Sequence, residues 1–196
     1  MARERDEPGI AAQAIEGGAR LIQLRDKTRE KGLQLPVALA LQALCREAGT
    51  LFFVNDHVDL ALAAGAGGVH LGQKDLPVDV VRRLVPPGMF IGCSTNNPDE
   101  ARRAEAEGAD YVSVGRLFPT GSKADTRPAT LDTLRSVKAA VSVPVCAIGG
   151  IDESNIDEVL AAGADMVSVI AAVIGADDVR AAARRLAARF PTGRVD

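Results

Sequence analysis

The chain has 196 residues, a formal net charge of −3 and a sequence pI of about 5.5. This length suits a single domain with one full core, and the acidic balance argues against a nucleic-acid-binding protein, which usually carries a basic surplus. No apolar run approaches the length of a membrane span, and the N-terminal segment MARERDEPGI lacks the apolar region of a signal peptide.

Composition narrows the fold class and the compartment. Hydrophobic residues make up 47% of the chain but aromatic residues only 3%, which favours β-branched parallel strands covered by Ala-rich helices. The three cysteines, Cys45, Cys93 and Cys146, are scattered and odd in number. They predict reduced core residues of a cytoplasmic protein, not a disulfide framework or a zinc site.

A repeated segment predicts the architecture. EGGARLIQLR, AAGAGGVHLG, AEGADYVSVG and AAGADMVSVI each run from an Ala-rich helix through glycine into a short apolar strand. Glycine after a helix fits the left-handed position that ends it. Each strand then carries an apolar residue followed by a polar one, and these polar residues are Gln23, His70, Ser113 and Ser168. Helix-to-strand steps repeated along a chain predict a parallel sheet.

The remaining elements follow in chain order. A first helix is predicted to begin near Pro8, and others to span residues 34–48, 57–64, 78–85, 97–107, 129–140, 152–162 and 176–189. Polar caps are expected at Asn97, Asp132 and Asp152. Between the repeats, strands are predicted in LFFVND (51–56), FIGCS (90–94) and VPVCAIGG (143–150).

Seven strands alternate with helices without a linker, which predicts one domain over residues 1–196. The expected fold is α/β, a (β/α)₈ TIM barrel that lacks one strand. A doubly wound open sheet is the alternative, but the sequence has no G-x-G-x-x-G fingerprint of the kind that such sheets usually carry. In a barrel, active sites form at the carboxyl ends of the strands.

Charged and polar residues gather at those predicted strand ends. Gln23, Arg25 and Lys27 alternate along LIQLRDK, so period-two geometry predicts that all three share the inward face of one strand. Asn55 and Asp56 end the next strand. Asp75 lies just past the strand after that, where it could instead cap the helix that starts near Pro77. Separated carboxylates and cations suit Mg²⁺ and a polyphosphate, because Mg²⁺ takes one or two carboxylates and completes its shell with water and phosphate.

Other strand ends could bind a phosphate group or a ring. Ser94 ends FIGCS, where it either donates a hydrogen bond to a ligand or caps the following helix. The loop GRLFPTGSK offers Thr120, Ser122 and Lys123, and AIGGI places glycine N–H groups just before a helix. By contrast, His57 is expected at the surface and His70 in the core with its hydrogen bonds satisfied. The sequence shows no pattern that indicates a catalytic Ser-His-Asp triad or Cys-His pair.

With these residues in view, the chain resembles the thiamine-phosphate synthase family, which also contains the thiazole tautomerase. QLRDK, VND followed by DLALAAGAGGVHLGQKDLP, GCST, FPTGSK, AIGGI and the final GAD segment occur in family order over residues 11 to 185. The resemblance implies a (β/α)₈ barrel. It also implies Mg²⁺-dependent coupling of 4-amino-2-methyl-5-(diphosphomethyl)pyrimidine to a thiazole phosphate, giving thiamine phosphate and pyrophosphate.

The resemblance also assigns roles to residues. In the implied dissociative mechanism pyrophosphate leaves first, the pyrimidine stabilises the cation, and the thiazole nitrogen attacks; the catalytic cations would be Arg25, Lys27 and Lys123. The implied metal ligands are Asp56 and Asp75. The pyrimidine diphosphate would be bound by Gln23, Leu24, Arg25, Asp26, Lys27, Asn55, Ser94 and Lys123, and the thiazole phosphate by Thr120, Gly121, Ser122, Gly150, Ile170 and Ala171.

The chain departs from the family pattern at two positions. The family often has threonine where this chain has Ser122, and serine where this chain has Ala171. The second difference loses a hydroxyl. The tautomerase carries a histidine where this chain has Arg116, which favours the synthase. A non-catalytic phosphate-binding barrel is the rival from another class. The expected partners are the two small substrates, with no nucleic acid and no membrane, and the sequence leaves a homo-oligomer open.

The resemblance creates one further expectation, about the N-terminus. The family's barrel begins with a strand before its first helix, whereas residues 1–10 are charged and show no apolar alternation. We therefore expect an open seam between LIQLR and MVSVI, and hypothesise that the natural protein has an upstream segment that would stabilise the barrel by pairing with these edges.

Overall fold

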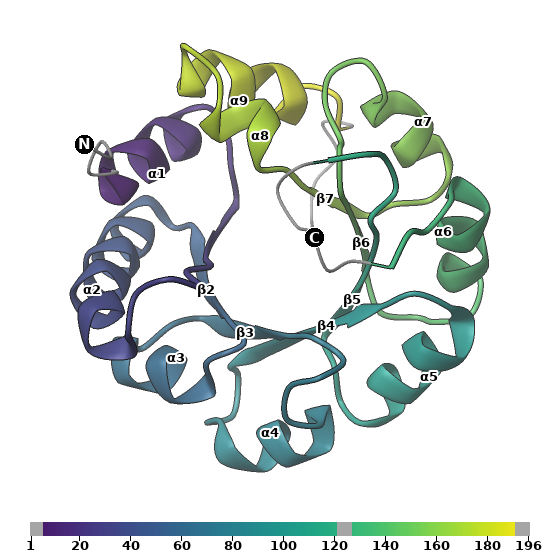
Figure 1. The fold of residues 1–196 in the computed structure, drawn as a ribbon, viewed down its shortest axis with the longest axis horizontal. Helices are drawn as coiled ribbons and strands as arrows, with labels where there is room; N and C mark the ends of the chain where they lie inside the picture. The colour runs from purple at the N-terminus through teal and green to yellow at the C-terminus, as the bar shows by residue number, and fades with distance from the viewer. Residues whose placement is uncertain (1–5, 121–126, 191–196) are drawn as a thin grey trace.

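A single parallel sheet of seven strands curls around the centre of the molecule, as the computed structural model shows for residues 6–120 and 127–190 (Figure 1). The strands pair in chain order from first to last, and each pair is parallel. They are β1 (Leu21–Leu24), β2 (Leu51–Asn55), β3 (Gly68–Leu71), β4 (Phe90–Thr95), β5 (Tyr111–Val114), β6 (Val145–Ile148) and β7 (Met166–Ser168).

Helices form an outer ring around this sheet (Figure 1). They are α1 (Glu7–Glu16), α2 (Lys31–Ala48), α3 (Val58–Ala64), α4 (Val78–Leu84), α5 (Pro98–Ala106), α6 (Leu131–Lys138), α7 (Ile156–Ala161), α8 (Ala171–Ile174) and α9 (Val179–Ala187). Helix α1 packs against both α2 and α9, so it bridges the seam between β1 and β7 from outside. The predicted TIM-barrel-like fold with an open seam is confirmed for the described residues.

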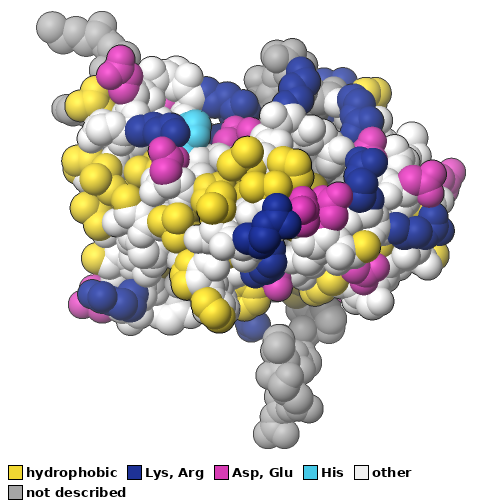
Figure 2. Space-filling view, turned by 90° about the horizontal axis from the view of Figure 1, so that it is seen from below, with side chains coloured by type: hydrophobic (Ala, Val, Ile, Leu, Met, Phe, Trp, Pro, Cys, Tyr) yellow, Lys and Arg dark blue, Asp and Glu magenta, His cyan; other side chains and the backbone are white. Residues whose placement is uncertain are grey.

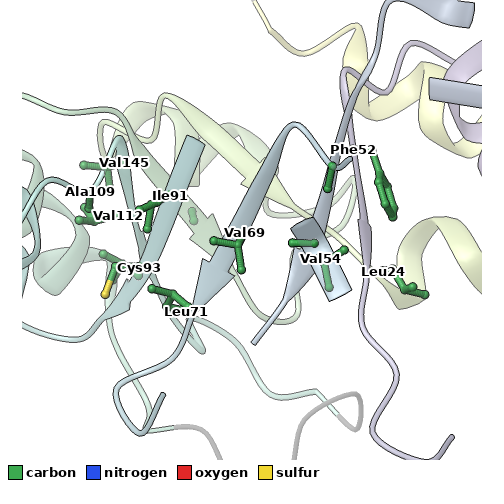
Figure 3. Close-up of a cluster of buried hydrophobic side chains, with 14 of the residues drawn as sticks. Leu24, Phe52, Val54, Val69, Leu71, Ile91, Cys93, Ala109, Val112 and Val145 are labelled. Atoms are coloured by element: carbon green, nitrogen blue, oxygen red, sulfur yellow. The ribbon is translucent and has the colours of Figure 1, made fainter. Parts of the chain in front are cut away.

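Most of the apolar side chains lie between the sheet and the helices. Alternate strand residues such as Leu24, Val54, Val69 and Ile91 point towards the helices and are almost completely buried (Figure 3). Small residues on the helices, such as Ala38, meet them. Burial of this layer is the main favourable contribution to folding. Short aliphatic side chains let helix and sheet approach closely, as the composition predicted.

A second, smaller cluster lies inside the barrel. Its buried members are Phe53, Tyr111 and Cys146, and Phe53 meets the ring of Tyr111 edge to face at 5.9 Å between centroids. The two rings fit because glycines lie beside them on the neighbouring strands. A Cβ at Gly68 would lie 2.3 Å from Phe53, and one at Gly92 would lie 2.1 Å from Tyr111. The interior therefore has an apolar floor of a few large rings.

The helix ends agree with the sequence prediction only in part. The glycines of the repeat, Gly18, Gly65, Gly108 and Gly163, all have positive φ. At the starts, Asn97 caps α5 through its side chain as predicted. The caps expected at Asp132 and Asp152 are wrong. Thr130 caps α6 in a capping box with Thr133, and Asn155 occupies the N-cap position of α7. Helix α8 was not foreseen.

The first strand is also shorter than predicted. It ends at Leu24, so Arg25 and Lys27 lie in the following loop and do not continue an inward strand face beside Gln23. Asp26 holds this loop, because its carboxylate pairs with Arg29 and accepts the N–H of Thr28 at 2.8 Å. A local turn therefore overrides the alternating pattern that suggested a longer strand.

The loop after β5 is held at its base by backbone and ionic contacts. The N–H of Arg116 donates to the carbonyl of Arg127 at 3.2 Å, and Ala129 donates back to Arg116 at 2.8 Å. Arg127 also makes two hydrogen bonds, of 2.8 and 2.7 Å, to the carboxylate of Glu100 on α5. The Arg127 guanidinium and the Asn96 N–H hold the pKa of Glu100 below its usual range. This charge-assisted pair ties the returning chain to a neighbouring helix.

Acidic and basic side chains are interspersed on the face seen in Figure 2, beside a patch of hydrophobic side chains. Ion pairs such as Arg83–Asp79 and Arg102–Asp99 join neighbouring helical turns. Among the described residues, no helix has the length and apolar character needed to cross a membrane. Cys45, Cys93 and Cys146 are free and buried, as predicted, and burial raises the pKa of Cys45 to about 11.

We expect Gly68→Ala to lower the free energy of unfolding by about 1–3 kcal/mol, because the new methyl group overlaps the Phe53 ring and forces repacking. Gly32→Ala is the matched control, since a Cβ there meets nothing within 4 Å. The control should leave the free energy of unfolding unchanged or raise it by up to about 1 kcal/mol. Urea unfolding of both variants measures this, and equal stabilities would contradict the assigned packing.

The Glu100–Arg127 pair predicts a pH dependence of stability. Because the pKa of Glu100 is lowered in the folded state, its contribution should be present above the unfolded value of about 4.3 and lost as pH falls through the folded value. The difference in unfolding free energy between the wild type and Arg127→Gln should therefore shrink between neutral pH and about pH 3. A difference that stays constant over this range would rule out the pair as its source.

Candidate active site

A cavity of about 990 Å³ opens at the carboxyl ends of the strands. Its lining comes from the loops that follow β1 to β7, which is the end of the barrel where the sequence analysis placed the site. The charged residues in its lining are Arg25, Lys27, Asp56, Lys74, Asp75, Arg116, Arg127 and Asp152. A cavity with so many charges, and more cations than carboxylates, suits an anionic ligand.

Two carboxylates and one ammonium group meet on one side of the cavity. The Nζ of Lys27 lies 3.6 Å from Oδ2 of Asp56. Asp75 lies next to Asp56, and its Oδ2 accepts the N–H of Gly72 at 2.7 Å. Burial and the neighbouring Asp56 carboxylate raise the pKa of Asp75. Paired carboxylates repel each other unless a cation lies between them, so this arrangement is suited to a divalent metal.

The backbone at Asp56 supports a special role for this position. Its φ is 64°, in the left-handed region that residues other than glycine rarely adopt. The N–H of Asp56 donates to the carbonyl of His70 on β3 at 2.8 Å, which holds the residue in place. Strained conformations of this kind cluster at functional sites. The alternative that Asp75 caps the helix near Pro77 is wrong. Pro77 occupies the N-cap position of α4, and α4 has no side-chain cap.

A layer of polar side chains forms the bottom of the cavity. Asn55, His70, Ser94 and Ser113 all line it, and all but Ser94 are buried. His70 bonds to Ser94 through Nε2 at 2.9 Å and to Tyr111 through Nδ1 at 2.8 Å. The prediction of a buried and satisfied His70 is therefore confirmed. Ser94 does not cap α5, because Asn97 does.

The opposite side of the cavity is a glycine-rich turn. Gly149 and Gly150 both have positive φ, and a Cβ at Gly150 would lie 2.7 Å from the carbonyl oxygen of Pro119. Glycine is therefore required where the β6 loop approaches the β5 loop. Thr120, Gly150, Ile170 and Ala171 line this side together. Gly121, Ser122 and Lys123 lie outside the described residues.

Three residues assigned to the substrate by resemblance do not line the cavity. Gln23 is exposed, Leu24 is buried in the core between sheet and helices, and Asp26 is engaged with Arg29. Their assignment as substrate ligands stays a prediction. Arg25, Lys27, Asn55, Asp56, Asp75 and Ser94 do reach the cavity.

Other lining residues were not singled out from the sequence. Ser113 and Ser168 line the cavity, and their signal was the polar position of the repeat, which His70 shares. Lys74 and Arg127 carried no comparable signal, because a charged residue in a loop looks the same in sequence whether it faces a cavity or solvent.

Comparisons with known proteins identify the family. A family model described as thiamine monophosphate synthase matches residues 1–173. A thiamine-phosphate synthase of Methanoculleus marisnigri is 49% identical over 197 residues, which cover 100% of this chain and 93% of that relative. A thiamine-phosphate synthase of Methanocella arvoryzae is 50% identical over 189 residues, covering 96% and 89%.

Solved structures show the same relationship. The thiamine phosphate pyrophosphorylase from Pyrococcus furiosus is 42% identical, with a TM-score of 0.88 over 94% of this chain and 89% of that one. A 3-hexulose-6-phosphate synthase, 19% identical with a TM-score of 0.69, shares the fold alone; the match covers 93% of this chain and 92% of that one. From the matching family model and the near-full-length relatives, the chain belongs to the thiamine monophosphate synthase family and has the function of a thiamine-phosphate synthase, a transferase.

Proposed function

We propose that the cavity couples an aminopyrimidine diphosphate to a thiazole phosphate with the help of Mg²⁺, and that the carboxylate side holds the diphosphate. The observation that carries this proposal is the meeting of Asp56, Asp75 and Lys27 at one edge of a cavity whose other edge is a glycine turn. The diphosphate and the smaller thiazole phosphate would thus bind at opposite edges of the same cavity.

The residues present fit a magnesium ion. Carboxylate oxygens are its preferred protein ligands, and one or two of them suffice when a polyphosphate supplies the rest. Asp56 and Asp75 are adjacent and border open cavity, so phosphate oxygens and water have room beside them. The ion would stabilise the negative charge that develops on the departing pyrophosphate.

Cationic side chains would neutralise the rest of that charge. Lys27 lies beside the carboxylate pair, and Arg25 lines the same side of the cavity. We assign Lys123 to this group from the family motif alone. Asn55 and Ser94, in the polar layer below, are placed to bind the pyrimidine ring. Preorganised charge of this kind stabilises a transition state without reorganising during the reaction.

The glycine side would anchor the acceptor. Thr120, Gly150, Ile170 and Ala171 surround a space next to N–H groups of the β6 loop. A phosphate held there would orient the thiazole nitrogen towards the pyrimidine. We assign Gly121 and Ser122 to the same anchor from the motif alone. Ala171 has no hydroxyl, so this position would contribute only its backbone.

This division of the cavity supports a dissociative mechanism. The charges in the lining serve to hold a leaving pyrophosphate, whereas His70, the one histidine in the lining, is held by hydrogen bonds within the protein. Departure of pyrophosphate before attack by the thiazole nitrogen requires charge stabilisation more than proton transfer. The cavity residue Arg116 stands where the tautomerase relative carries histidine, which favours the synthase over that isomerase.

We expect Asp56→Asn and Asp75→Asn each to lower kcat by about 10²–10³, because each removes charge that holds the leaving group and its metal. The measurement is pyrophosphate release from the two substrates in saturating Mg²⁺. Asp79→Asn is the matched control, since that carboxylate pairs with Arg83 on the surface of α4. Near-normal turnover of both cavity variants would show that Asp56 and Asp75 are not essential metal ligands.

We expect Lys27→Ala to weaken binding of the pyrimidine diphosphate, and Lys27→Arg to restore it only in part. An ammonium group is a compact point charge, whereas a guanidinium needs a wider planar site. Isothermal titration with the diphosphate measures the change. Lys31→Ala serves as control, because Lys31 pairs with Asp59 outside the cavity. Unchanged affinity in Lys27→Ala would show that Lys27 does not contact the diphosphate.

A further inference from the structure

A buried hydrogen-bonded chain lies beneath the cavity and takes no part in the charge stabilisation described above. The Tyr111 hydroxyl lies 2.8 Å from Nδ1 of His70, and Nε2 of His70 lies 2.9 Å from Oγ of Ser94. Tyr111 and His70 are 8% and 6% exposed, so water cannot readily replace either bond. Ser94 is half-buried and lines the cavity.

The direction of the protons follows from the Tyr111 end. Burial raises the pKa of Tyr111 far above its usual range, so the phenol keeps its proton. Among the described residues, His70 Nδ1 is the hydrogen-bond partner of this hydroxyl. A buried hydroxyl needs an acceptor for its hydrogen. Tyr111 therefore donates to Nδ1, which must be the unprotonated nitrogen of the ring.

The proton positions in the remaining hydrogen bond, from His70 to Ser94, follow from this assignment. An imidazole that accepts at Nδ1 carries its hydrogen on Nε2. Nε2–H then donates to Oγ of Ser94 at 2.9 Å, since the other nearby oxygen, Oγ of Ser113, lies farther away at 3.5 Å. That bond occupies an acceptor position of the serine and leaves its own hydrogen to point elsewhere. Among residues 6–120 and 127–190, the Ser94 hydroxyl has no second hydrogen-bond partner. Its hydrogen is therefore available to the cavity.

The backbone of Ser94 is held as well. The amide of Gln73 donates to the Ser94 carbonyl at 2.6 Å, and Arg103 donates to the other end of that amide at 3.4 Å. Strand pairing with β5 fixes the same residue from the other side. With its main chain held, the serine has its side-chain torsion and its hydroxyl rotation left to set, and the bond from His70 restrains both.

We propose that His70, oriented by Tyr111, is a positioning residue that leaves the Ser94 hydroxyl hydrogen to be donated to the substrate. The hydroxyl hydrogen then needs an acceptor on the substrate at this point, such as an unprotonated ring nitrogen or a phosphate oxygen. This proposal rests on the proposed use of the cavity for the pyrimidine diphosphate. It adds an expectation about which edge of the pyrimidine ring lies against Ser94.

The first test reads the tautomer directly. The chain has two histidines, so ¹⁵N-histidine NMR gives two ring systems, and a His57→Gln variant assigns them. We expect the Nε2–H tautomer of His70 in the wild type and a mixture of tautomers in Tyr111→Phe. A ring protonated at Nδ1 in the wild type, or a Tyr111→Phe spectrum unchanged at His70, would overturn the proposal. This readout does not depend on catalysis, so it stands even if the proposed reaction fails.

The second test compares two replacements of the same ring. Glutamine can place an N–H near the position of Nε2, whereas asparagine reaches only the position of Nδ1. We expect His70→Asn to lower kcat/KM by about tenfold, roughly the loss of one oriented hydrogen bond, and His70→Gln to stay within about threefold of wild type. Equal losses in the two variants would show a merely structural role, and circular dichroism confirms that each variant is folded.

A double-mutant cycle separates action through Ser94 from an independent effect. If His70 acts through Ser94, adding His70→Asn to Ser94→Ala should cost no more than about twofold beyond Ser94→Ala alone. Losses that multiply, to about a hundredfold together, would mean that the two residues act independently and would overturn the proposal. Wild-type pyrophosphate release is measured first, because its absence would instead refute the proposed function.

Discussion

The hydrogen bond between Tyr111 and His70 joins the two parts of the barrel interior. Below it lie the aromatic rings of the floor, and above it the polar layer opens into the cavity. Parallel strands present alternate residues inward, so each strand can change from apolar to polar within a single inward step. The tyrosine satisfies both layers, because its ring packs against Phe53 while its hydroxyl faces the histidine. Through this contact the floor is linked to His70 and, by the second ring nitrogen, to Ser94 at the cavity.

The charge distribution in the cavity follows from a different constraint. Side chains that end parallel strands converge, so carboxylates and cations far apart in sequence come together without any local motif. Asp56 and Asp75 are the clearest case. Their mutual repulsion and partial burial are unfavourable in isolation, and Lys27 offsets them only in part. A cation between the two carboxylates would relieve this repulsion.

The sequence predicted the fold well because its signals were local and repeated. Glycine after each Ala-rich helix marked where strands begin, and the four predicted left-handed positions are present. It predicted Asn55, Asp56, Asp75 and Ser94 at the cavity because strand ends are easily read. It failed where side-chain contacts decide the outcome. The Asp26 turn ended β1 early, and Thr130 displaced Asp132 as a cap. The partner of Arg127, 27 residues away in sequence, has no local signature at all.

The glycine beside Tyr111 links two positions that are 19 residues apart. A side chain at position 92 and a large ring at position 111 would occupy the same space, since even a Cβ would lie 2.1 Å from the ring. Position 92 therefore cannot gain a side chain while position 111 keeps its large ring. A barrel of this kind that acquired a larger residue on the inward face of β4 would first have to give up the tyrosine, and with it the group that sets the tautomer of the histidine. Comparing the two positions across related barrels would show which of them share this hydrogen-bonded floor and which must orient their serine by other means.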